Sequence, residues 1–178
     1  MKLILIDGGP ASGKNTLGNL LVGKFREIGD KAILLDLDVY VEEFNPQWIW
    51  DNEQQKEKDQ FNARINLAKE INKYLKDNFT VIVIGERLLT KENIEKFVSR
   101  LEITCPTYLY HLSIPLALRE KRLNQRGHSP LIDLPKDQKD RNAVKEWPGY
   151  VYENVNSPES DSQNLMSLIQ EGKGLVRP

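Results

Sequence analysis

One short segment, a glycine-rich turn between an apolar run and an amphipathic stretch, constrains the fold of this chain more than any other feature. The segment reads Gly8-Gly9-Pro10-Ala11-Ser12-Gly13-Lys14. The apolar run before it, residues 3–6, is short and continuous, which is typical of a strand buried on both faces. The residues after it that share one helical face are Leu17, Leu20, Leu21, Phe25 and Ile28. The sequence therefore predicts a strand, a tight turn and a helix in immediate succession.

The spacing of the turn fits G-x-x-x-x-G-K, and a strand before it and a helix after it are the context that a phosphate-binding P-loop requires. Glycines let backbone N–H groups converge on phosphate oxygens, and the start of the helix adds the positive end of its dipole. The residues predicted to hold the phosphates of ATP are Gly8, Gly9, Pro10, Ala11, Ser12, Gly13, Lys14, Asn15 and Thr16. Lys14 is expected to act in catalysis, because it neutralises charge on the β- and γ-phosphates.

The residue after Lys14 departs from the usual pattern. It is Asn15, whereas a serine or threonine hydroxyl normally binds Mg²⁺ at this position. An amide oxygen is a poorer ligand for a hard cation but can serve, so we predict that Asn15 contacts the metal directly or through water. Thr16 follows, and its hydroxyl is expected to contact phosphate.

Apolar runs and helical patterns alternate along the chain. The predicted strands are residues 3–6, 32–37, 81–84, 107–112 and 150–155. The residues predicted to form the buried face of one long helix are Phe61, Ile65, Ala68, Ile71 and Leu75. Thr90 and Ser157 are placed to cap two later helices. This order predicts a three-layer α/β/α fold of the P-loop NTPase type, with a five-stranded parallel sheet.

We expect a single kinase domain over residues 1–178, because this length fits one hydrophobic core. Two segments interrupt the alternation. A segment of about residues 40–60 is predicted to form an acceptor-binding insertion, and a segment of about residues 119–147 is predicted to form a lid. The stretch 128–148 within and just after the lid reads as irregular. Inserted segments at the carboxyl ends of parallel strands are where such folds bind ligands.

Composition limits the partners of this chain. The 25 basic and 26 acidic side chains nearly cancel, which disfavours binding to a long nucleic acid. A single cysteine excludes an internal disulfide and favours a reducing compartment, and two histidines are too few for a histidine-rich metal site. No apolar stretch approaches the roughly 20 residues of a membrane span, and no secretory signal is evident, so a cytoplasmic location is expected. The oligomeric state is not indicated.

The second predicted strand ends in Leu35-Asp36-Leu37-Asp38, and this ending resembles that of shikimate, gluconate and adenylylsulfate kinases. The resemblance implies that Asp36 organises Mg²⁺ through water and that Asp38 contacts the hydroxyl of the acceptor. A carboxylate at a strand end can orient an alcohol and accept its proton, so Asp38 is the candidate catalytic base.

Residues 118–128 resemble the segment that leads into the lid of gluconate-kinase-like proteins. Arg122 and Arg126 share a helix face, so we expect both to close on the transferring phosphoryl group. The third predicted strand ends in Gly85-Glu86-Arg87. We predict that Glu86 lies in the outer shell of the metal and that Arg87 binds an anionic acceptor, as does Arg64. Surface or interhelical salt bridges are the alternative for these two arginines.

Three further side chains have simpler interpretations. Trp48 and Trp50, in the insertion, either stack on a planar acceptor or form the local core of that segment. His111 lies in an apolar strand and is predicted to be a buried histidine with satisfied hydrogen bonds.

Together these features predict a kinase that uses ATP and Mg²⁺ to phosphorylate a hydroxyl of a small-molecule acceptor. The chain lacks the N-K-x-D motif of GTPases and is too short for a typical AAA+ ATPase with its helical lid domain. A nucleoside or nucleoside monophosphate kinase is one alternative, which Asn15-Thr16, Arg64 and Arg87 favour and Asp38 opposes. An ATP-binding module with weak hydrolysis is another, favoured only by Asn15. A polynucleotide 5′-hydroxyl acceptor is less compatible with the neutral charge.

Overall fold

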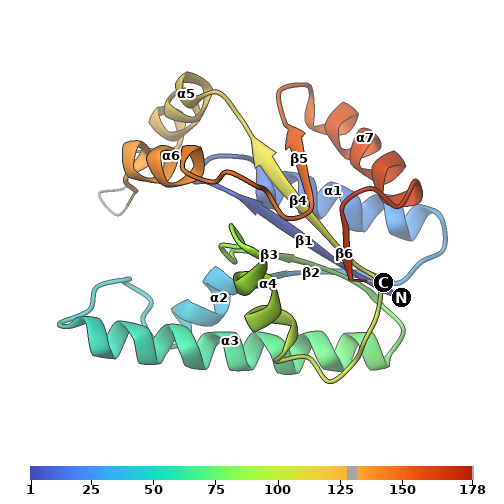
Figure 1. The fold of residues 1–178 in the computed structure, drawn as a ribbon, viewed down its shortest axis with the longest axis horizontal. Coiled ribbons are helices and arrows are strands. Elements are labelled where there is room, and N and C mark those ends of the chain that lie inside the picture. Colours follow the sequence, from blue (N-terminus) through green and yellow to red (C-terminus); the bar gives the residue numbers. More distant parts are fainter. Residues whose placement is uncertain (128–131, 178) are drawn as a thin grey trace.

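The computed structural model describes residues 1–127 and 132–177, which fold around one sheet (Figure 1). Five strands run parallel in the order β2-β3-β1-β4-β5. Their bounds are Lys2–Gly8 for β1, Ala32–Asp36 for β2, Thr80–Ile84 for β3, Thr107–Ser113 for β4 and Tyr150–Glu153 for β5. The predicted parallel sheet is confirmed, and β1 lies at its centre, so the loop after β1 emerges in the middle of one sheet edge.

A sixth strand escapes prediction from the sequence. β6, Leu175–Arg177, pairs antiparallel with the beginning of β4. With three residues, one of them charged, it is too short to show the alternation from which a strand is predicted.

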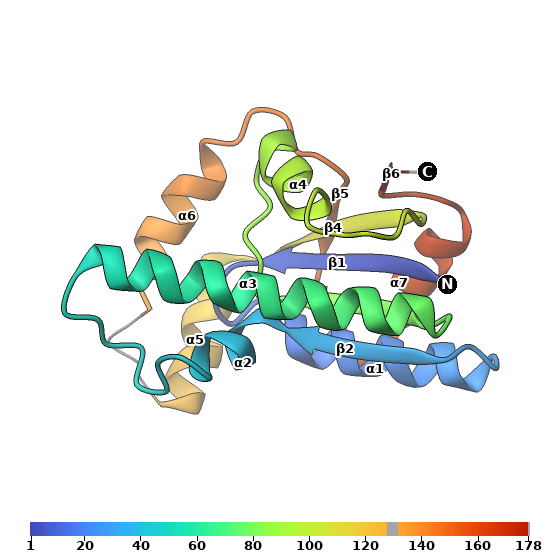
Figure 2. The ribbon, with the colours of Figure 1, turned by 90° about the horizontal axis from the view of Figure 1, so that it is seen from below.

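Helices cover both faces of the sheet and complete three layers (Figures 1 and 2). On one face, α1 (Lys14–Glu27) and α7 (Pro158–Gln170) pack on a core that includes Ile4 and Ile82. On the other face, α3 (Glu53–Lys76) and α4 (Lys91–Val98) pack on a core that includes Leu5 and Val83. Successive residues of β1 and β3 alternate between the two cores, which explains why these strands are apolar throughout.

Three other helices lie near the carboxyl ends of the parallel strands (Figure 1). They are α2 (Leu37–Glu42), α5 (Leu116–Arg126) and α6 (Leu134–Asn142). The strand prediction for Leu37 is wrong, because the Asp36 side chain accepts a hydrogen bond from the Asp38 backbone N–H at 3.1 Å and starts a helix there. The irregular stretch predicted at 128–148 likewise contains α6, which is capped by Asp133. Of the predicted lid, residues 128–131 lie outside the described residues.

Side-chain caps set several helix starts. Thr90 and Asn93 form a reciprocal capping box at α4, and Ser157 caps α7, as predicted. Asn52 accepts a hydrogen bond from the Gln55 backbone N–H at 2.8 Å and starts α3. The second half of the predicted insertion is therefore the first two turns of a long helix.

The buried face of α3 agrees with the predicted one over the later turns only. Ala68, Ile71 and Leu75 are buried as predicted, whereas Phe61 is 56% exposed and Ala63 is buried in its place. Figure 2 shows the cause, because the first turns of α3 extend past the strands and have no sheet to pack against. Among the described residues, none of the helices is both long and apolar enough to span a membrane.

The packing of α3 allows a test of which face of this helix is buried. We expect Ile71→Ala to lower the free energy of unfolding by about 2–5 kcal/mol, because it leaves a cavity in the core. Phe61→Ala, on the exposed part of the same helix, is the control and is expected to change it by less than about 1 kcal/mol. Urea denaturation of both variants measures the difference, and equal losses in the free energy of unfolding would contradict this assignment of the buried face.

Candidate active site

The loop between β1 and α1 has the shape of a phosphate cradle. Gly13 adopts the left-handed conformation with φ of 94°, and the loop closes with a hydrogen bond from the Ser12 backbone N–H to the Gly9 carbonyl at 3.2 Å. Gly9 has no space for a side chain, because a Cβ atom there would collide with the side chains of Asp137 and Arg119. The loop therefore depends on glycine at positions where the backbone must turn and where other side chains approach it.

Lys14 lies folded over this loop. Its Nζ donates to the carbonyl oxygens of Gly8 at 2.7 Å and Gly9 at 3.3 Å. Burial lowers the pKa of Lys14 from its ordinary value, and the nearby carboxylates of Asp7 and Asp38 oppose that shift. The ammonium group is held at the loop, where phosphate oxygens would meet it.

Two aspartates follow β2 beside the loop. Asp36 accepts hydrogen bonds from the Asn15 side-chain amide at 3.0 Å and from the Asp38 backbone N–H. Asp38 as a whole residue is exposed, but its carboxyl group belongs to the cleft that Lys14 lines. Partial desolvation there, reinforced by the charge of Asp36, raises the pKa of Asp38 to about 6. Such a carboxylate is ionised at neutral pH and is a better proton acceptor than an ordinary aspartate.

The end of β3 brings Glu86 to the same cleft. Its Oε2 accepts a hydrogen bond from Arg64 Nε at 3.2 Å, while the buried Oε1 has no hydrogen-bond partner among the described residues. Arg64 also donates to the Gln60 carbonyl at 3.2 Å. Arg87, the next residue, donates to Asp137 at 3.3 Å and to Asp140 at 2.9 Å. Both arginines predicted to bind an acceptor anion are thus already paired with carboxylates.

Arginines of α5 contact the phosphate loop directly. Arg119 is only 3% exposed, and its Nε donates to the Pro10 carbonyl at 2.9 Å. Arg122 donates to the Ala11 carbonyl at 3.3 Å. Arg119 is one of three arginines in residues 118–128, with Arg122 and Arg126, of which at least one is expected in catalysis, and its spacing of three residues from Arg122 puts it on the same helix face. Arg126 lies one turn further on and lines the cleft.

A buried network of charges links α6 to the end of β1. Arg141 donates to Asp7 at 2.9 Å and to Asp137 at 3.2 Å, and Asp137 also accepts from Arg119 at 2.6 Å. Although burial alone would raise it, the pKa of Asp7 is held well below its usual range by hydrogen bonds from His111 and Arg141. No part of this network was predicted apart from the burial of His111, which is confirmed.

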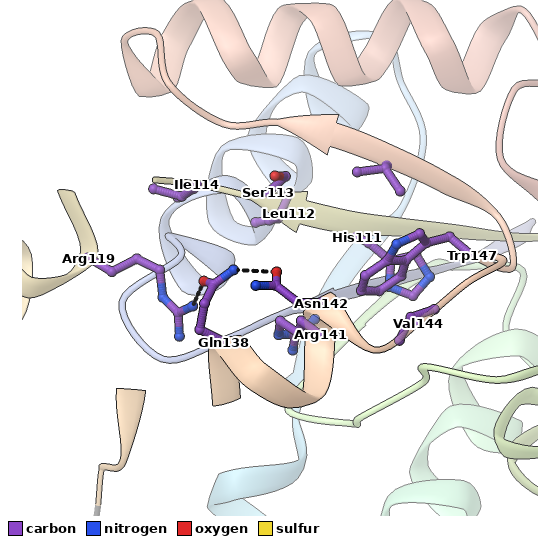
Figure 3. Close-up of a pocket in the computed structure, with 11 residues that line it drawn as sticks. His111, Leu112, Ser113, Ile114, Arg119, Gln138, Arg141, Asn142, Val144 and Trp147 are labelled. Carbon is purple, nitrogen blue, oxygen red and sulfur yellow. Dashed lines mark hydrogen bonds between the residues drawn. The ribbon is translucent and has the colours of Figure 1, made fainter. Parts of the chain in front are cut away.

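His111 completes the network from β4. Its Nδ1 lies 2.9 Å from Asp7 Oδ2, and its Nε2 lies 2.6 Å from the Pro148 carbonyl oxygen. Figure 3 shows a pocket lined by Arg119 and Arg141, in which Gln138 bridges Arg119 and Asn142. These groups line a cavity of about 240 Å³ that also includes Trp147.

The candidate active site is a cleft of about 760 Å³ at the carboxyl end of the sheet. The predicted site residues that line it are Gly8, Gly9, Pro10, Ala11, Lys14, Asn15, Asp38, Glu86, Arg87 and Arg126. Gly13, Thr16, Arg122 and Arg126 line a neighbouring pocket of about 190 Å³ with Asn154. Ser12 is buried beneath the loop, while Asp36 and Arg64 lie behind residues that line the cleft.

The residues of the cleft fit a magnesium ion only in part. Among the described residues, no group of three or more histidine, cysteine, aspartate or glutamate side chains is arranged to hold a metal. Asp36 already accepts two hydrogen bonds, and Glu86 keeps one unpartnered oxygen. This donor set suits a cation whose other ligands are phosphate oxygens and water, as is common for Mg²⁺.

Comparisons with known proteins agree with this architecture. A family model described as an AAA domain matches residues 3–149. A search of curated proteins by sequence finds no match. The described residues form one α/β unit, with no separate helical domain among them.

Several solved kinases have a similar fold. A sugar kinase from Janibacter sp. HTCC2649 is 12% identical with a TM-score of 0.67, covering 96% of this chain and 95% of that chain. Shikimate kinase from Aquifex aeolicus is 19% identical with a TM-score of 0.60, covering 96% and 97%. APS kinase from Mycobacterium tuberculosis, solved with AMPPNP and APS, is 16% identical with a TM-score of 0.62, covering 95% and 97%. The chain therefore has the P-loop kinase fold, and the predicted resemblance to this group is confirmed.

The buried network makes a stability prediction. We expect Asp137→Asn to lower the free energy of unfolding by about 3–5 kcal/mol, because it leaves buried arginines without their shared carboxylate. Asp140→Asn is the matched control: its side chain is 45% exposed and contacts only Arg87 in this network. We expect this control to cost less than about 1 kcal/mol in the same denaturation experiment. Two equally mild variants would show that the network does not hold α6 in place.

Proposed function

The chain belongs to the family of AAA domains whose model matches residues 3–149, and we propose that it is an ATP-dependent kinase that phosphorylates a hydroxyl of a small-molecule acceptor. The observation that carries this proposal is the presence of Lys14 and Asp38 in one cleft. Lys14 supplies positive charge at the phosphate loop, and Asp38 supplies a proton acceptor of raised pKa beside it. Phosphoryl transfer to an alcohol needs both groups.

In the proposed reaction, the backbone N–H groups of the loop and Lys14 bind the β- and γ-phosphates. Asp38 accepts a hydrogen bond from the acceptor hydroxyl and takes its proton as the new O–P bond forms. The bond between the γ-phosphorus and the β,γ-bridging oxygen breaks, and its electron pair leaves with ADP. Lys14 stabilises the charge that develops on that oxygen.

The arginines of α5 support the same step. Arg126 lines both the cleft and the pocket beside Thr16, and Arg122 lines that pocket. In the proposed reaction both contact the phosphates. Arg119 acts on the loop itself, because it donates to the Pro10 carbonyl. We propose that residues 119–147 act as the lid, whose closure excludes water that would otherwise compete as the acceptor.

We propose that Mg²⁺ binds together with the phosphates of ATP. Asn15, Asp36 and Glu86 would hold its water shell, and the ion would neutralise phosphate charge. The chain's own contribution is to fix these oxygen atoms, as the contacts from Asn15 and Asp38 to Asp36 do.

One alternative keeps a specific observation in its favour. The side chain of Asn15 donates to Asp36 where P-loop kinases usually present a hydroxyl to the metal. That arrangement favours an ATP-binding module with only weak hydrolysis. Turnover with an acceptor well above the rate with water alone separates the two functions.

The direct test is an ATP-consumption assay with Mg²⁺ over a panel of hydroxyl acceptors. We expect Asp38→Asn to lower turnover by about 100-fold or more while ATP still binds, because general-base catalysis contributes that much. Lys14→Ala is expected to weaken both ATP binding and turnover. Asp30→Asn, an exposed change in the connection between α1 and β2, is the control and should retain activity. Full activity in Asp38→Asn would contradict the role of this residue.

The pH profile tests the same role independently. Asp38 must be ionised to accept a proton, so kcat/KM is expected to rise with pH around a midpoint near 6. Asp36→Asn removes a negative charge beside it and should move the midpoint downward, toward the ordinary aspartate value of about 4. A profile whose midpoint is the same in wild type and Asp36→Asn would show that another group titrates.

A further inference from the structure

The part of the cleft beside Asp38, here called the acceptor end, is negatively charged. This charge restricts which compounds can bind there as the acceptor. Resting on the kinase function proposed above, we propose that the acceptor is a neutral or positively charged hydroxyl compound without an anionic group, and that Glu42 and Trp48 select it. Neither residue is among the predicted site residues that act on phosphate. Both line the cleft with Asp38. They come from α2 and the connection to α3, at the same end of the molecule as α5 (Figures 1 and 2).

The arginines that would recognise an anionic acceptor are already neutralised. Arg64 donates to Glu86 at 3.2 Å, and Glu86 is only 9% exposed. Arg87 divides its guanidinium between Asp137 and Asp140. An acceptor carboxylate or phosphate would have to displace these carboxylates, one of which is buried in the network that holds α6.

The carboxylates at this end have no such partners. Asp38 and Glu42 are four residues apart on α2, so they share a helix face. Neither forms an ion pair with a residue in the described ranges 1–127 and 132–177. Two unpaired carboxylates in one recess repel an anion and attract hydrogen-bond donors or a cation.

The positively charged side chains of Lys14 and Arg126 are not available to an anionic acceptor. Lys14 is bonded to the phosphate loop, and Arg126 also belongs to the pocket beside Thr16. Both are therefore on the nucleotide side, where the charge of the triphosphate balances them. With ATP bound, the acceptor end keeps its negative charge, and an anionic acceptor would meet both the carboxylates and the γ-phosphate.

Trp48 supplies the apolar surface of the same recess. Its backbone adopts a left-handed conformation with φ of 57°, and its ring packs edge-on against Trp50 with centroids 6.0 Å apart. Trp50 is fixed by a hydrogen bond from its Nε1 to Asp59 at 3.0 Å. The pair packs on the core that includes α3, as one of the two alternatives from the sequence predicts, and Trp48 also lines the cleft. An indole face suits the C–H face of a sugar, a planar ring or an organic cation.

The first experiment compares acceptors that share a skeleton and differ in charge. One set is glucose, gluconate and glucosamine; a second is adenosine and AMP. We expect the neutral or cationic member of the active set to have a kcat/KM at least about tenfold above that of its anionic partner. Glu42→Gln should raise KM for glucosamine more than for glucose, while leaving KM for ATP unchanged. Preference for gluconate or AMP would overturn the proposal.

The second experiment reads the charge of the recess without any substrate. Quenching of tryptophan fluorescence by caesium and by iodide is measured in the whole chain at constant ionic strength, and the signal of Trp48→Phe is subtracted. Normalised to free N-acetyltryptophanamide, caesium is expected to quench Trp48 at least about twofold better than iodide. Glu42→Gln should reduce that ratio, whereas Glu27→Gln, at the far end of α1, should not. More efficient quenching by iodide would overturn the proposal even if no acceptor is turned over.

The two experiments also separate this inference from the kinase function. A flat acceptor panel together with strong caesium quenching would count against the kinase function and support the charge of the recess. Turnover of an anionic acceptor alone would support the kinase function and overturn the inference.

Discussion

The shared carboxylate of Asp137 is the contact on which the rest of the site depends. It joins Arg87 after β3, Arg119 on α5 and Arg141 on α6, and Arg141 in turn binds Asp7. Asp7 directly precedes the first glycine of the phosphate loop. Because buried charges are tolerated only when each has its partners, removing one member leaves the others unpaired. The network therefore couples the position of α5 and α6 to the loop.

The cleft has two ends of opposite character. At one end, Lys14 and the arginines of α5 surround the loop, so charge complementarity favours a phosphate chain. At the other end, Asp38, Glu42 and Trp48 form a recess that is acidic and partly aromatic. In the proposed reaction a polyanion is joined to an alcohol, and a cleft divided in this way would favour one orientation of the two. The carboxylates at the second end would disfavour an anionic phosphate donor bound in the reverse direction.

Much of this architecture could be predicted from local patterns. The phosphate loop has a fixed spacing and a strand and helix around it, and the parallel strands are continuous apolar runs. The caps of α4 and α7 could likewise be predicted from Thr90 and Ser157, because each capping signal is contained in a few consecutive residues. Asp36 and Asp38 were identified by the resemblance of this strand ending to that of shikimate, gluconate and adenylylsulfate kinases, and they lie at the end of β2, an edge where such folds bind ligands.

The remainder depends on contacts between residues far apart in the chain. Arg141 and Asp7 are separated by more than 130 positions, and no periodic pattern in the sequence indicates that they pair. Salt bridges were the alternative expected for Arg64 and Arg87, but no local pattern identifies their carboxylate partners, and this pairing decides whether either arginine can bind an anion. The exposed position of Phe61 depends on where α3 passes the edge of the sheet, which only the assembled layers determine.

The central claim is that the loop end of the cleft holds the β- and γ-phosphates of ATP. Thermal unfolding with Mg²⁺ and ATP, AMP or adenosine, all at one concentration that saturates the wild-type chain with ATP, tests it most directly in the wild-type chain and in Lys14→Ala. At 100 times the dissociation constant, binding adds about 2.7 kcal/mol of stability, which corresponds to roughly 5–10 °C in Tm for a chain of this size. The account predicts that ATP gives such a rise in wild type, that AMP and adenosine give little, and that Lys14→Ala loses most of it. An equal rise with adenosine, or none with ATP, would contradict it.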